Sequence, residues 1–74
     1  MKDIVWTATV DSNMWRVDVV RKSDYRADLE VYRVSDETLV HSEEVGLSYQ
    51  AIFGPDVADV AEWQSIAIEV IDSQ

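Results

Sequence analysis

The stretch "MWRVDVVRKSDYRADLEVYRV", residues 14–34, sets the architecture of this chain. Apolar residues occupy about every second position in two runs, which a polar segment at 22–24 separates. Alternation with a period of two predicts β-strands with one buried face. Ser and Asp are typical of tight turns because their side chains bond the nearby backbone. The stretch therefore predicts an antiparallel hairpin with strands over about 14–22 and 25–34.

The same alternation continues on both sides of this hairpin. A strand over about 3–11 is expected to place one set of side chains on one face: Ile4, Trp6, Ala8 and Val10. A strand over about 38–46 is expected to do the same with Leu39, His41, Glu43 and Val45. Short polar turns join all four runs, so they predict an antiparallel meander.

Residues 55–72 repeat apolar positions at helical spacing. Gly54 fits the N-cap and Pro55 the first helical position, where its missing N–H costs nothing. The apolar face is expected to contain Val57, Val60, Ala61, Ala67, Ile68 and Ile71, and Trp63, Ile66 and Val70 extend it to one flank. That flank fits either the core or a partner's groove.

These elements predict one α+β domain over residues 1–74: a four-stranded antiparallel β-meander followed by one C-terminal amphipathic helix packed on one face. The connector at 46–54 is too apolar for a free loop. Four of its residues are expected to pack against the sheet edge or the start of the helix: Leu47, Tyr49, Ile52 and Phe53.

A chain of 74 residues without cysteine has no disulfide to stabilise it, so its hydrophobic core must suffice or a partner must help. No apolar run approaches the roughly 20 residues that span a bilayer. The start of the chain alternates in polarity, unlike a secretory signal. These features favour a cytoplasmic protein.

The net charge of −9 is unevenly distributed. Residues 1–33 hold all six basic residues and six acids, whereas residues 34–74 hold nine acids and no base. Such a field repels nucleic acid and anionic membranes and attracts basic surfaces. The expected partner is therefore a basic protein surface, with no direct binding of nucleic acid or membrane.

The residues that could carry catalysis or bind a metal are sparse. His41 is the only histidine and lies within a predicted strand, where Ser42 would face the opposite side. Adjacent acids such as Glu43 and Glu44 also point apart on a strand, which is poor geometry for a metal. We therefore expect no enzyme activity, no metal and no cofactor.

The predicted helix offers a row of carboxylates without neighbouring bases. Candidate partner-binding residues are Asp59, Glu62, Trp63, Ile66 and Glu69, with Glu43 and Glu44 from the sheet. Solubility alone would account for the acids, but solvated helices usually interleave both signs, so recognition is favoured. A row of carboxylates can also imitate the phosphates of a nucleic acid. The alternative is a structural or oligomerising accessory protein that uses its sheet edges and the Trp63/Ile66 flank.

The segment "LSYQAIFGPDVADVAEWQ", residues 47–64, resembles small uncharacterised acidic proteins of actinobacteria and their phages. The resemblance covers this part of the chain alone, and it transfers no activity and no site residue. By analogy of size and charge, it implies a phage-type inhibitor or a DNA mimic.

Overall fold

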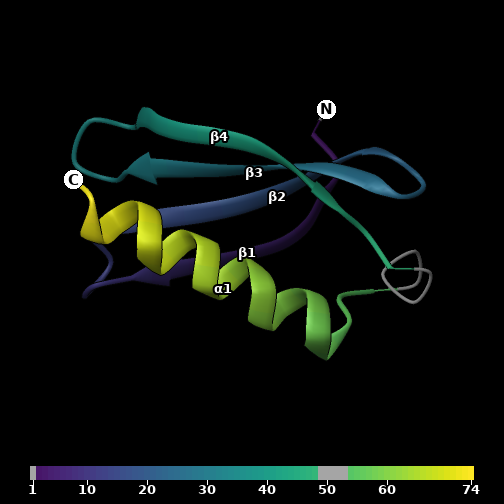
Figure 1. Cartoon of the computed structure of the whole chain (residues 1–74). Helices are drawn as coiled ribbons and strands as arrows, with labels where there is room; N and C mark the ends of the chain where they lie inside the picture. The colour runs from purple at the N-terminus through teal and green to yellow at the C-terminus, as the bar shows by residue number, and fades with distance from the viewer. Residues whose placement is uncertain (1, 49–53) are drawn as a thin grey trace.

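The computed structural model describes residues 2–48 and 54–74, which form one sheet and one helix (Figure 1). The strands are β1 (Ile4–Val10), β2 (Trp15–Ser23), β3 (Arg26–Arg33) and β4 (Thr38–Gly46), and the helix is α1 (Val57–Asp72). Neighbouring strands are antiparallel in the order β1-β2-β3-β4. The α+β fold predicted from the sequence, an antiparallel meander followed by a C-terminal helix, is confirmed.

The core lies between α1 and one face of the sheet. Its buried side chains are Val17, Val19, Ala27, Leu29, Val31, Val45, Leu47, Trp63 and Ala67. Most of them come from alternate positions of the two central strands, as the period-two pattern predicts. Of the apolar residues expected to pack in the connector, Leu47 is buried, whereas Tyr49, Ile52 and Phe53 lie outside the described residues.

The described sheet has three register shifts, and those in β1 and β4 change which predicted residues share a face. In β1, Ile4 lies opposite Val20 but Trp6 lies opposite Val19, so the register shifts at Val5. Ile4 and Trp6 therefore face opposite sides of the sheet, and the expectation that they share a face is wrong. A bulge inserts one residue without changing the composition of the strand, so the sequence pattern does not reveal it.

A second register shift separates Leu39 from the rest of its predicted face. His41 lies opposite Val31, whereas Leu39 lies opposite Tyr32. Leu39 therefore belongs to the outer face, away from α1, and His41, Glu43 and Val45 belong to the α1 side. The prediction that all four residues share a face is wrong for Leu39.

The helix begins two residues later than the sequence predicts. Asp56, with φ −84° and ψ 144°, is the N-cap, and Val57 is the first helical residue. Gly54 and Pro55 precede the cap and do not occupy the predicted N-cap and first position. Pro still fits here, because its fixed φ suits the extended chain that leads into a helix.

The buried face of α1 is centred on Trp63. Trp63 is fully buried, whereas Val57 is 84% exposed and Ile68 is 51% exposed. The predicted face, with Val57 and Ile68 as members, is therefore rotated from the observed one. Trp63 has the largest apolar surface on the helix, so its burial stabilises the docked orientation most.

Candidate functional site

All six basic residues lie within ion-pair distance of a carboxylate. The pairs are Lys2–Glu30, Arg16–Asp18, Arg16–Glu37, Arg21–Asp3, Lys22–Asp28, Lys22–Glu44, Arg26–Glu44 and Arg33–Asp36. They involve seven of the fifteen acidic residues, so this part of the molecule is nearly neutral. The Lys and Arg side chains therefore pair with carboxylates of their own chain.

Asp18 is the centre of the ion pairs on the outer face of the sheet. It is buried, its Oδ1 accepts a 2.7 Å hydrogen bond from Thr7 Oγ1, and its Oδ2 accepts one of 3.3 Å from Arg16 Nε. The Arg16 guanidinium also lies 4.6 Å from the centre of the Tyr32 ring. These contacts connect three strands, and the carboxylate and guanidinium contribute to the fold.

Glu44 is also a member of this outer network. Arg26 Nη1 donates a 2.6 Å hydrogen bond to Glu44 Oε1, and Lys22 Nζ donates one of 3.1 Å to Oε2. The hydrogen bond from Lys22, and then that from Arg26, lower the pKa of Glu44 from its ordinary value of 4.5. Glu44 therefore contacts bases of its own chain and does not extend the acidic surface as predicted.

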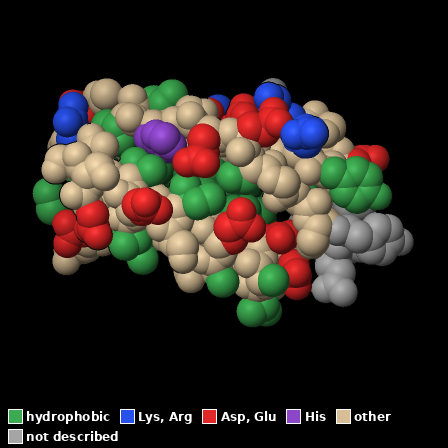
Figure 2. All heavy atoms as spheres, viewed as in Figure 1, with side chains coloured by type: hydrophobic (Ala, Val, Ile, Leu, Met, Phe, Trp, Pro, Cys, Tyr) green, Lys and Arg blue, Asp and Glu red, His purple; other side chains and the backbone are tan. Residues whose placement is uncertain are grey.

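The other eight carboxylates have no Lys or Arg within 4.0 Å in the described part of the chain. They are Asp11, Asp24, Glu43, Asp56, Asp59, Glu62, Glu69 and Asp72. Five of the eight belong to α1 or its N-cap, and Glu43 belongs to β4. Figure 2 shows carboxylates spread over the α1 and β4 side, with Lys and Arg side chains at its edges. We call this side the acidic face.

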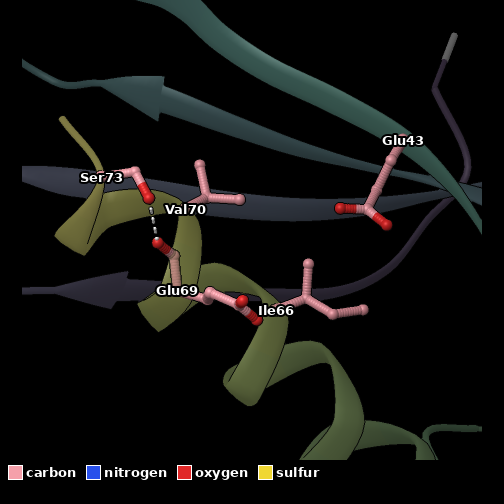
Figure 3. A pocket seen from close by; sticks show the side chains of 5 residues that line it. All are labelled: Glu43, Ile66, Glu69, Val70 and Ser73. Carbon is pink, nitrogen blue, oxygen red and sulfur yellow. Dashed lines mark hydrogen bonds between the residues drawn. The ribbon is translucent and has the colours of Figure 1, made fainter.

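A groove of about 330 Å³ runs between α1 and the edge strand β4 on this face. It is lined by Glu43, Ile66, Glu69, Val70 and Ser73. Figure 3 shows Ile66 and Val70 extending from α1 toward the sheet, and Glu43 extending from β4 toward the helix. The groove thus combines apolar side chains with a carboxylate from each of its two walls.

Helical spacing aligns the acids along this groove. Glu62, Ile66, Glu69 and Ser73 are three or four residues apart and therefore lie on one side of α1. Asp59 lies one turn earlier, and its Oδ2 accepts a 3.0 Å hydrogen bond from the Ser48 backbone N–H. Asp59 therefore connects the first turn of α1 to the segment that follows β4.

His41 orients the carboxylate on the β4 wall. Its Nε2 lies 2.8 Å from Glu43 Oε1, and both side chains are partly exposed. The two residues are two positions apart on a strand, so they share a face. His41 was not among the predicted binding residues, although its spacing from Glu43 is a signal that the sequence contains.

Apart from Glu44, which belongs to the outer network, the predicted binding residues fall into three groups. Glu43, Ile66 and Glu69 line the groove, and Glu62 is exposed on the same side of α1. Asp59 is half-buried beside Ser48. Trp63 is fully buried in the core, so the prediction that it forms an exposed flank for a partner is wrong.

The groove is chemically suited to a long cationic side chain. Lys and Arg carry apolar stems that pack on aliphatic residues while their charged heads seek carboxylates. Ile66 and Val70 offer the aliphatic surface, and Glu43 and Glu69 offer the carboxylates. Within residues 2–48 and 54–74, no three metal-ligating side chains are grouped so that they could hold a metal ion.

The described part of the chain has no helix with the length and apolar character needed to cross a membrane. Comparisons of this chain with protein-family models, with curated proteins and with solved structures find no match.

Proposed function

We propose that the protein is a non-catalytic binding module that recognises a basic protein surface through its acidic face. The observation that carries this proposal is the separation of charge. The Lys and Arg side chains are paired on the outer face and around the turns, while Glu43 and the carboxylates of α1 have no Lys or Arg within 4.0 Å in the described part of the chain. A solubility function alone does not require this separation.

The groove between α1 and β4 is the proposed centre of recognition. A Lys or Arg of the partner inserts its stem between Ile66 and Val70 and brings its head toward Glu43 and Glu69. Glu62 and the remaining helical acids surround this contact and attract further basic side chains. The cation also relieves the mutual repulsion of carboxylates that face each other across the groove.

Binding of this kind has a defined dependence on ionic strength. Electrostatic complementarity mainly accelerates association, and its long-range part is screened by salt. We therefore expect the affinity for a basic partner to fall steadily as salt is added. An affinity that is independent of salt would contradict the proposal.

A fluorescein-labelled peptide rich in Lys and Arg serves as the probe, with fluorescence anisotropy as the measurement. The test variant is Glu62→Gln/Glu69→Gln, and the matched control is Asp11→Asn/Asp24→Asn. Both double variants change the net charge from −9 to −7. We expect the test variant to lose about tenfold in affinity, near 1.4 kcal/mol, and the control to change by less than about twofold. Equal losses would show that net charge alone governs binding.

A narrower form of the proposal is that the protein inhibits a nucleic-acid-binding protein by imitating the phosphate row. The support is the line of Asp59, Glu62 and Glu69 along one side of a rigid helix. Competition tests it: duplex DNA and this protein should exclude each other from a strongly basic DNA-binding protein. Simultaneous binding of both would reject mimicry while leaving the broader proposal standing.

A further inference from the structure

The two edges of the sheet differ in charge. β1 and β4 each pair with one neighbour only in the described sheet. β4 carries His41, Glu43 and Glu44, whereas the seven residues of β1, IVWTATV, include no charged residue. β1 also lacks Lys and Pro, with which natural proteins commonly block an exposed edge.

A neutral groove accompanies the β1 edge. It has a volume of about 310 Å³ and lies between β1 and α1. Its lining residues are Trp6, Ala8, Thr9, Val10, Gln64, Ala67 and Ile68, none of which is charged. Ile68 is 51% exposed, so it adds accessible aliphatic surface to this groove.

The register of β1 leaves a regular segment available for pairing. The irregularity lies at Val5, near the start of the strand. From Trp6 to Val10 the partners run without interruption from Val19 to Trp15. A regular strand with one unpaired edge is a template for another strand.

The distribution of charge indicates which kind of partner can pair with the β1 edge. Two copies with a net charge of −9 repel each other, most strongly where their acidic faces approach. A basic partner gains little at β1, because neither the strand nor its groove offers a carboxylate. Along Ile4–Val10 a second copy can approach without setting like charges directly opposite each other, because no residue of this strand is charged.

We infer that a second copy of this chain pairs with β1 in antiparallel orientation and forms a symmetric dimer. The two four-stranded sheets then join into one, with β1 against β1 at the centre and β4 at both ends. A two-fold axis makes the same patch serve both copies. Trp6, Ala8 and Val10 meet their counterparts on the α1 side, and Thr7 and Thr9 meet theirs on the outer face.

This arrangement leaves the two acidic grooves at opposite ends of the joined sheet. Because β4 is the far edge of each copy, dimerisation covers none of the groove residues. The dimer would thus engage two basic sites on one partner or bridge two partners. The inference does not depend on the proposed function, because it rests on the neutral edge.

The dimer should be weak and should respond to salt in the opposite direction from partner binding. A short strand pair with one adjacent groove buries less surface than a stable complex usually does. Added salt screens the repulsion between two acidic copies, so it strengthens their association. Binding of a basic peptide weakens under the same conditions.

Sedimentation equilibrium over micromolar to millimolar concentrations, at low and high salt, tests the inference. We expect the mass to rise from 8.4 kDa toward twice that value, at lower concentration in high salt. Thr9→Glu should weaken association at least tenfold, whereas Ser42→Glu, an equal change at an exposed residue of β4, should leave it unchanged. Circular dichroism confirms that both variants fold.

A second pair of variants tests the groove independently of the strand. Ile68→Glu should weaken the dimer, whereas Val57→Glu, the same change at an exposed residue of α1 outside the groove, should not. A protein that stays monomeric at all concentrations and salts would overturn the inference. So would a dimer that Ser42→Glu disrupts as strongly as Thr9→Glu, or an assembly that grows beyond two copies.

Discussion

On the outer face of the sheet, each Lys or Arg meets a carboxylate, and Asp18 is buried between Thr7 and Arg16. On the α1 side, by contrast, carboxylates outnumber bases, and Glu43 and Glu69 face a groove. The same residue type therefore has two uses in one small protein. Acids on the outer face hold strands together, and acids on the acidic face remain available to a partner.

The difference between the two faces requires α1 to be docked on the sheet, and Trp63 is the side chain that holds it there. It is fully buried and its ring lies 5.8 Å from that of Trp6. Trp63→Ala should destabilise the fold by about 3–5 kcal/mol, since it removes a large apolar surface and leaves a cavity. Urea denaturation followed by circular dichroism measures this. Val57→Ala, at an exposed position of the same helix, should change stability by less than about 0.5 kcal/mol.

Asp18 tests the structural use of acids on the outer face. Asp18→Ala should cost about 1–3 kcal/mol, because it leaves Thr7 and Arg16 without their shared acceptor. Asp24→Ala, in the exposed turn after β2, should stay within about 0.5 kcal/mol of the native protein. Equal unfolding midpoints for the two variants would show that the outer network contributes nothing.

Glu44 and Glu69 should respond to neutralisation with opposite signs. Glu44→Gln removes the negative charge that Lys22 and Arg26 share, so it should lower the unfolding midpoint. Glu69→Gln removes a negative charge near the C-terminal end of α1, where the helix dipole disfavours it, and should raise stability by about 0.3 kcal/mol. Thermal unfolding in low salt measures both effects. Shifts of the same sign would mean that the two faces do not differ in this way.

The smallest effect concerns Asp36, which is exposed beside Arg33. The hydrogen bond from Arg33, followed by that from Thr38, lowers the pKa of Asp36 from 3.8 to about 2. Because the folded pKa is depressed, the stabilisation is present above pH 3.8 and is lost as the pH falls through about 2. An NMR titration measures the pKa directly. The stability of the Asp36→Asn variant should fall less steeply than that of the native protein as the pH is lowered through this range. Equal slopes would contradict a stabilising contribution from the Asp36 carboxylate.

The sequence predicts where the strands and the helix lie along the chain better than it predicts which of their side chains face the core. Alternation identifies the strands because one side of the sheet is buried, and helical spacing identifies α1. The register shifts at Val5 and near Val40 are invisible to alternation, since a bulge adds a residue without marking it. The rotation of α1 toward Trp63 depends on how the helix fits the sheet, which the helical pattern alone does not determine.

The candidate site could be predicted only in part, again because the sequence pattern does not determine how α1 lies on the sheet. Ile66 and Glu69 share a side of α1 by spacing alone, but Glu43 reaches that side only through the tertiary arrangement of α1 and β4. Strand alternation already places Glu43 and Glu44 on opposite faces of the sheet, so it argues against Glu44 as a partner of Glu43 in the site. The burial of Trp63 could not be predicted, since an apolar flank fits both a core and an interface.

The contact between Trp6 and Trp63 also provides the chain with an internal optical reporter. The two rings are tilted by 44°, and such close indoles couple their electronic transitions. The residues belong to the first strand and to the last element, so their contact forms only when the two ends of the chain meet. The meander needs mostly local pairing, which is fast, whereas closing this long loop is slower. We expect an exciton signal in circular dichroism to appear after the strand signal during refolding.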